Sequence, residues 1–179
     1  PHLVIAVAAM AILLLGNMVR NRGLMTVLSV GAMAVGMIYG VMQWAAPQSG
    51  FYGMVAIDNF SVFFSIIFIS TGIMAILMSR DYLVAKNIDS HEYNVLIMFA
   101  TVGMMLMASS TDLLVIFLGL EIMSVPLYVM AGMARRDNFS GESGIKYFII
   151  GAFPSGCLVS GIALIYGATG TTDLRRILA

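Results

Sequence analysis

The sequence has 179 residues, of which 60% are apolar and 10% are charged, whereas roughly a quarter of the residues of an average soluble protein are charged. This composition excludes a water-soluble fold and predicts an integral membrane protein. Nine Lys and Arg residues balance nine Asp and Glu residues, so the chain has no basic excess with which to bind nucleic acid.

The sequence contains no motif for an iron–sulfur cluster, a flavin or a nucleotide. His2 and His91 have no partner at the spacing of a metal site, and Cys157 lies in an apolar run, where it is expected to pack as a small side chain. The chain opens with Pro1 and His2, without a charged segment before its first apolar run. We therefore expect no cleaved signal peptide, and we expect that residue 1 is not the first residue of the gene.

Six apolar stretches are long enough to cross a bilayer as helices, which takes about 20 mostly apolar residues. The fold class predicted is therefore all-α, a polytopic bundle of six transmembrane helices. The predicted spans are approximately Leu3–Val19, Met25–Ala45, Asn59–Ser79, Tyr93–Ser109, Leu113–Met133 and Ser143–Ala168.

The basic residues of the connections are distributed asymmetrically. The first, third and fifth loops hold Arg20, Arg22, Arg80, Lys86, Arg135 and Arg136, whereas the second and fourth loops hold no Lys or Arg. The positive-inside rule then places the odd loops in the cytoplasm and the N-terminus outside. Arg175 and Arg176 in the tail run against this assignment, and we expect the tail to lie along the interface.

Glu121 is the carboxylate expected deepest in the membrane. It lies nine residues, or ~13 Å, from Asp112 at one end of its span, and farther from Arg135 at the other. An ionised carboxylate near the bilayer centre costs at least ~2.5–3.5 kcal/mol, so such residues usually face a bundle interior and take part in a transport pathway. The alternative is a protonated Glu121 that only hydrogen-bonds a neighbouring helix.

Helical spacing places Ser124 and Tyr128 on the same face as Glu121, where their hydroxyls are suited to orient the carboxylate or to hold water. Pro126 lacks a backbone N–H and frees the carbonyl of Ile122, which adds an acceptor near the acid. This combination predicts a proton relay, although Pro126 alone indicates no more than a packing kink.

Lys146 is the second candidate for proton transfer. It lies about four residues, or ~6 Å, beyond Glu142, so its ammonium can reach the interface and pair with Glu142. Spacing alone favours a functional and a structural role equally. Glu121 should lie more than about ten ångströms deeper in the adjacent span, so we expect no direct Glu121–Lys146 salt bridge.

The remaining polar and small residues predict structural roles. Acidic residues at the span ends are expected to cap helices or to be solvated, namely Asp58, Asp81, Asp89, Glu92, Asp112 and Asp137. Small residues at four-residue spacing predict close helix packing, as in Gly36 with Gly40, Gly151 with Ser155, and Gly156 with Ser160. The sixteen methionines are expected to fill helix contacts.

Several segments resemble the antiporter-like subunit N of proton-pumping NADH:quinone oxidoreductase (complex I), the equivalent of mitochondrial subunit 2. They are EYNVLIMFATVGMMLMASSTDLL from Glu92, FLGLEIMSVPLYVM from Phe117, KYFIIGAFPSG from Lys146 and YGATGTTDL from Tyr166. IDNFSVFF from Ile57 and MSRDYL from Met78 resemble the third helix and exit loop of that subunit. The first two spans match it only in hydropathy and position.

The resemblance implies a role for the polar residues of the last two spans. In that family a Glu of the fifth helix tunes a lysine on a broken seventh helix, so Glu121 is implied to be that acid and Lys146 a residue of the polar axis or of proton access. Residues 1–91 are then three N-terminal transmembrane helices, and residues 92–179 the first three helices of the antiporter-like repeat. The seventh-helix lysine and a second inverted repeat would lie beyond Ala179. Pro154 departs from the small or aliphatic residue expected there.

By this resemblance the chain is a proton-translocating membrane-arm subunit of a respiratory translocase and performs no redox chemistry itself. NADH, flavin, iron–sulfur clusters and quinone are implied in partner subunits, and the partners are neighbouring antiporter-like and small membrane subunits. The implied location is the bacterial inner membrane. The alternatives are a subunit of a multisubunit cation/proton antiporter and a structural or assembly subunit in which Glu121 only joins helices.

Overall fold

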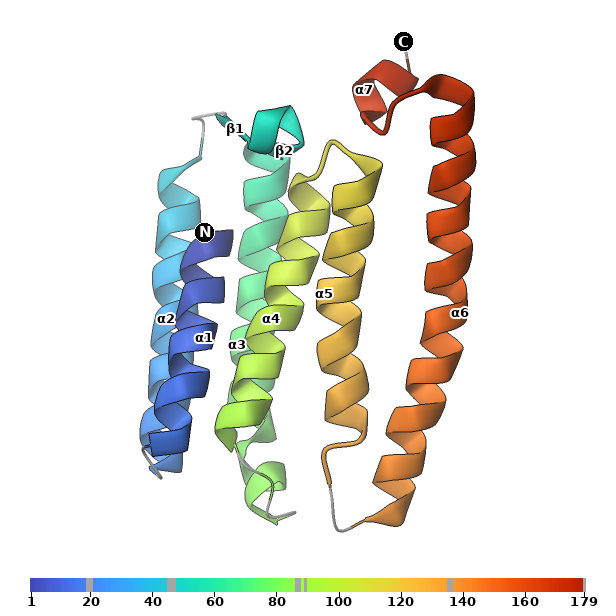
Figure 1. Cartoon of the computed structure of the whole chain (residues 1–179). Helices are drawn as coiled ribbons and strands as arrows, with labels where there is room; N and C mark the ends of the chain where they lie inside the picture. The colour runs from blue at the N-terminus through green and yellow to red at the C-terminus, as the bar shows by residue number, and fades with distance from the viewer. Residues whose placement is uncertain (19–20, 45–47, 86–87, 89, 135–136, 179) are drawn as a thin grey trace.

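The computed structural model describes residues 1–18, 21–44, 48–85, 88, 90–134 and 137–178, and within them six long helices run up and down in sequence order (Figure 1). A short helix, α7 (Leu174–Ile177), follows the last of them. The six are α1 (His2–Met18), α2 (Arg22–Met42), α3 (Asn59–Ala85), α4 (Ser90–Ser109), α5 (Leu113–Ala131) and α6 (Asn138–Thr169).

Five of these helices are long and apolar enough to cross a membrane, and they correspond to the second through sixth predicted spans. They are Gly23–Met42, Asn59–Ala85, His91–Ser109, Leu113–Ala131 and Asn138–Thr169. The apolar part of α1 is shorter, His2–Gly16. A mostly helical membrane bundle is therefore confirmed for the described residues, in which five helices meet the length and apolarity of a membrane span.

Two helices extend beyond their predicted ends. Arg80, predicted in a loop, lies inside α3, which continues to Ala85, and α6 begins at Asn138, five residues before the predicted start. Hydropathy identifies the part of a helix that suits lipid, whereas a helix ends where its backbone is capped. Of the other basic residues used for orientation, Arg22 opens α2, and Arg20, Lys86, Arg135 and Arg136 lie outside the described residues.

The core forms around α4. Buried side chains of α1 to α4 make one apolar cluster that includes Ile5, Met33, Ile69 and Met98. More than half of the α4 span is buried, against 6% of the α6 span. Figure 1 accordingly shows α4 inside the bundle and α6 at its edge, next to α5.

Several predicted structural roles are confirmed. Asp112 caps α5 and Asp137 caps α6, each by accepting a bond from a backbone N–H two residues on. Asp58 accepts from the Ser61 N–H at the start of α3. The predicted close packing at Gly36 is also present, because a Cβ there would lie 2.6 Å from the Cγ1 of Ile5 on α1. A Cβ at Gly156, in contrast, would meet nothing within 4 Å among the described residues, so the packing predicted there stays a prediction.

The connection between α2 and α3 forms a small antiparallel hairpin that the sequence did not predict. Strand β1 (Gln48–Gly50) pairs with β2 (Val55–Ile57), and a 3₁₀ turn, η1 (Phe51–Gly53), joins them. Phe51 and Tyr52 have positive φ angles of 50° and 56°, a backbone conformation that residues other than glycine rarely adopt. The hairpin lies at the same end of the bundle as α7 (Figure 1).

Candidate functional site

Glu121 lies at the middle of α5. It follows Leu113 by eight residues and precedes Ala131 by ten, or ~12 and ~15 Å at 1.5 Å per residue. The side chain is partly buried, and its Oε1 atom is enclosed without a hydrogen-bond partner. Most buried polar atoms in proteins have a partner, so this oxygen retains an unused capacity to accept a hydrogen bond.

The face of α5 opposite Glu121 packs closely against α4, with no room for a side chain between the two backbones at Gly103. A Cβ at Gly103 of α4 would lie 2.6 Å from the Gly119 carbonyl oxygen and 2.9 Å from the Met123 Cα. Successive residues turn by about 100° around a helix. Glu121 is therefore turned by roughly 160° from Met123, and its side chain points away from α4.

The face that carries Glu121 is the one that meets α6. Tyr128, seven residues on, makes edge contacts with Tyr147 at 4.9 Å and Phe148 at 5.8 Å between ring centroids. Ser124 on the same face is buried, and Pro126 lies buried inside the helix. The predicted set of Glu121, Ser124 and Tyr128 is therefore brought to one side of α5, although neither hydroxyl bonds the Oε1 of Glu121.

The register between α5 and α6 places Ser155 level with Glu121. The helices touch where Gly132 meets Gly144, because a Cβ on Gly144 would lie 2.9 Å from the Gly132 Cα. Eleven residues back along α5 lead to Glu121, and eleven forward along antiparallel α6 lead to Ser155, ~17 Å in each helix. Ser155 is half-buried and lies one turn beyond Gly151, which contacts Tyr128. Sequence reasoning assigned Ser155 to packing alone, because its level with Glu121 depends on the register.

Lys146 is not brought to Glu121. It is exposed and pairs with Glu142 one turn earlier on α6, as its spacing predicts. Lys146 lies two residues past Gly144 and so is level with Met130, nine residues or ~13 Å along α5 from Glu121. Within the described part of the chain, no group of three or more His, Cys, Asp and Glu side chains is placed to hold a metal ion.

Comparison with known sequences relates the chain to a family of membrane transport subunits. The family described as "NADH:quinone oxidoreductase/Mrp antiporter, TM" matches residues 110–179. NADH-quinone oxidoreductase subunit N of Trichlorobacter lovleyi is 44% identical over 180 residues, covering 99% of this chain and 37% of that protein. Subunit N 2 of Roseiflexus castenholzii is 45% identical over 148 residues, covering 83% and 30%. The chain thus spans about a third of the length of these relatives.

Solved structures share the fold. A chain of respiratory complex I from Thermus thermophilus with bound aureothin aligns with a TM-score of 0.83 and 28% identity, over 97% of this chain and 38% of that chain. A chain of the Mrp complex from Dietzia sp. DQ12-45-1b has the same fold, with a TM-score of 0.68 and 20% identity over 96% of this chain and 35% of that one. The identity along nearly the whole chain and the common fold together identify it as a homologue of the antiporter-like subunit N of NADH-quinone oxidoreductase.

Proposed function

We propose that this chain is part of a proton-translocating membrane-arm subunit of a respiratory NADH:quinone oxidoreductase, and that Glu121 takes up and releases a proton within it. The observation that carries the proposal is the Glu121 carboxylate at mid-span, with an enclosed Oε1 that has no hydrogen-bond partner. Homology to subunit N supports the same assignment. Redox chemistry, with its NADH, flavin, iron–sulfur clusters and quinone, belongs to partner subunits in this proposal.

The surroundings of Glu121 suit a group that changes its protonation state. A charged carboxylate at this depth costs at least ~2.5–3.5 kcal/mol unless it is paired or hydrated. The hydroxyls of Ser124 and Tyr128 share its face, and Ser155 lies level with it on α6. Pro126 leaves the Ile122 carbonyl without its helical donor. A proton or a water molecule at Oε1 would satisfy the free oxygen and connect it to these groups.

Lys146 takes a different place in the proposed path. Because it is exposed and paired with Glu142 at the far end of α6 from Ser155 and the tail, we assign it to proton access near the membrane surface. The cationic partner of Glu121 is then supplied by another helix of the subunit.

The same proposal includes the membrane arrangement. We place α1 as a sixth span, since its 17 residues measure ~25 Å and it packs into the same core as α2 and α4. The N-terminus lies outside, the partners are neighbouring antiporter-like and small membrane subunits, and the membrane is a bacterial inner membrane. The described helix ends support this arrangement, because α1, α3 and α5 end on one side of the bundle (Figure 1).

The test is Glu121→Gln in the intact complex, with Asp81→Asn as the control. Both changes replace one carboxyl group by an amide, but Asp81 is exposed on α3. We expect Glu121→Gln to leave the complex assembled and to lower the number of protons moved per quinone reduced, measured in sealed vesicles, whereas Asp81→Asn should pump normally. Full pumping by an assembled Glu121→Gln complex would leave only the interhelical role.

A cation/proton antiporter subunit is the second candidate, because the family match names the Mrp antiporter and the Mrp complex shares the fold. The two candidates differ in the driving force, which is electron transfer in one case and a sodium gradient in the other. Purification of the native complex decides between them. Copurifying iron–sulfur and flavin subunits would exclude the antiporter, and sodium-driven proton movement without them would exclude the oxidoreductase.

A further inference from the structure

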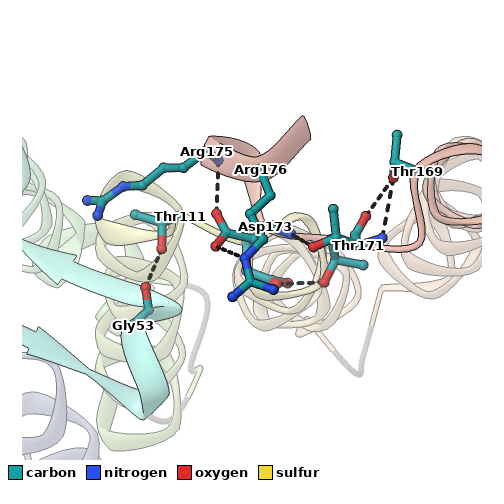
Figure 2. A network of polar contacts seen from close by, with 9 residues as sticks. Gly53, Thr111, Thr169, Thr171, Asp173, Arg175 and Arg176 are labelled. Atoms are coloured by element: carbon teal, nitrogen blue, oxygen red, sulfur yellow. Dashed lines mark hydrogen bonds and ion pairs between the residues drawn. The ribbon is translucent and has the colours of Figure 1, made fainter. Parts of the chain in front are cut away.

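Three segments that are distant in the sequence meet in a polar cap at one end of the bundle. The connection between α4 and α5 (Ser110–Asp112) lies between the α2–α3 hairpin and the tail that follows α6. On one side Thr111 donates from its N–H to the Met54 carbonyl and from its hydroxyl to the Gly53 carbonyl. On the other side Asp112 forms an antiparallel bridge with Asp173. Figure 2 shows the hydrogen bond from Thr111 to Gly53 and the contacts of Asp173 with Arg175 and Arg176.

The bridge to the tail combines backbone and side-chain hydrogen bonds. Leu113 donates its N–H to the Thr172 carbonyl, and Leu174 donates its N–H to the Thr111 carbonyl, both at 3.0 Å. The Thr172 hydroxyl donates to Oδ2 of Asp112 at 2.6 Å, while Oδ1 accepts from the N–H that caps α5. Asp112 is only 3% exposed. The carboxylate thus ties the tail to the start of α5 with both of its oxygens in use.

This tie matters because the two halves of α6 are held differently. In the first half, Gly144 and Gly151 lie against α5, where a Cβ would contact Gly132 and Tyr128. In the second half, a Cβ on Gly156, Gly161 or Gly167 would meet nothing within 4 Å, and Ile162 is the one buried residue among those described in α6.

Pro154 separates these halves and lacks the N–H that would bond the Ile150 carbonyl, which makes bending there easier. The second half of α6 therefore lies between Pro154 at one end and the tail at the other. Ser155, level with Glu121, begins this half.

We propose that the Asp112–Thr172 hydrogen bond and its backbone bridge set the distance between the second half of α6 and α5, so that Asp112 and Thr172 are positioning residues for Glu121. This inference rests on the proposed proton-transfer role of Glu121. Neither residue touches Glu121. They act from the end of the bundle, by closing α6 over the face of α5 that carries the acid.

The test uses Thr172→Val, which removes the hydroxyl and leaves Asp112 free to cap α5. The readout is the rate at which N-ethylmaleimide labels Ser155→Cys in a Cys157→Ser background, in the intact complex in membrane vesicles. Loss of one hydrogen bond to a buried carboxylate should raise this rate by roughly tenfold as the two helices separate. Protons moved per quinone reduced should fall in the same vesicles, measured without the labelling substitutions.

Three further variants sharpen the result. Thr169→Val is the matched control, because among the described residues the hydrogen bonds of the Thr169 hydroxyl reach only Ile165 of α6 and Thr171 of the tail, and none reaches α5. Thr172→Ser keeps the hydroxyl and should restore both readouts. Leu174→Pro removes the second backbone donor of the bridge, and proline is well tolerated at the first residue of a helix, so it tests the bridge should Thr172→Val assemble poorly.

Unchanged labelling in both Thr172→Val and Leu174→Pro would overturn the proposal. Faster labelling with normal pumping would overturn the positioning role, because the helices would then separate without consequence for proton transfer. Labelling at residue 155 does not depend on the chemistry of Glu121. A failure of the proposed function, seen as full pumping by Glu121→Gln, is therefore distinguishable from a failure of the tie between the tail and α5.

Discussion

The contact between Gly151 of α6 and Tyr128 of α5 gives a sharp test of how the candidate site is built. A Cβ added at Gly151 would be closest to the Tyr128 Oη, and it would lie 2.6 Å from Cζ and 2.8 Å from Cε1. Real Cβ atoms almost never come this close to other atoms, so Gly151→Ala must displace the ring or separate the helices. Tyr128 makes edge contacts with the rings of both Tyr147 and Phe148, which restrict how far its own ring can turn aside.

Two opposing effects decide the size of the change. Alanine is favoured over glycine inside a helix by ~0.5–1 kcal/mol, and overpacking costs ~1–3 kcal/mol. We therefore expect Gly151→Ala to destabilise the subunit by roughly 0.5–2 kcal/mol. The matched control is Gly156→Ala, five residues along the same helix, where a Cβ meets nothing within 4 Å. It should leave stability unchanged or raise it by up to ~1 kcal/mol.

The assay is the apparent thermal midpoint of the subunit in the detergent-solubilised complex, together with protons pumped per quinone reduced. Tyr128→Phe removes the atom nearest the new methyl group. It should therefore recover part of the loss in the double variant, with a coupling energy of at least ~0.5 kcal/mol. Equal midpoints for Gly151→Ala and Gly156→Ala, or purely additive effects in the double variant, would refute the packing of α6 on Tyr128 and the register that places Ser155 level with Glu121.

Two more predictions concern the bundle that supports the site. Gly103→Ala should lower the same midpoint by an overpacking cost of ~1–3 kcal/mol, because its Cβ would meet backbone atoms of α5 that cannot rotate away; Gly31→Ala, which meets nothing, is the control, and equal midpoints would contradict the close α4–α5 contact. Asn94→Ala should cost ~0.6 kcal/mol and at most ~1.7 kcal/mol, the average and the maximum for interhelical hydrogen bonds in a membrane bundle, because the buried Asn94 amide donates to the Thr26 hydroxyl; an unchanged midpoint would show that this bond does not join α2 to α4.

Hydropathy predicted the helices of the bundle well and their ends poorly, for a physical reason. A long apolar run must be helical in lipid because its backbone has no other partner there. The ends are instead decided by caps and by polar residues that continue a helix beyond the apolar run. Asp137 accepts the Phe139 N–H and starts α6 among polar residues, and α3 carries Arg80 past the predicted boundary. Because both extensions contain charged residues, the pattern of apolar residues does not predict them.

Some residues of the candidate site could likewise be predicted from the local sequence, whereas others depend on contacts between distant segments. Glu121 was identifiable because a carboxylate within an apolar run is expensive, and its shared face with Ser124 and Tyr128 follows from helical spacing alone. Ser155 and the Asp112–Thr172 tie were not identifiable, since each depends on the register between segments 34 and 60 residues apart. The strands of the hairpin have three residues each, too few for an alternating pattern to be recognised.

The free oxygen of Glu121 connects these observations. Two buried side-chain oxygens in the described residues have no partner, one on Gln43 and one on Glu121. Gln43 is uncharged and lies at the C-terminal cap of α2, whereas Glu121 is ionisable and lies at mid-span. The cost of an unsatisfied carboxylate there disappears when Oε1 gains a proton or a water molecule. Because the face of α5 that carries Glu121 is the face that meets α6, a change that moves α6 alters the space for a proton or a water molecule at that face. Gly151 and Thr172 should therefore influence proton transfer without touching the acid that performs it.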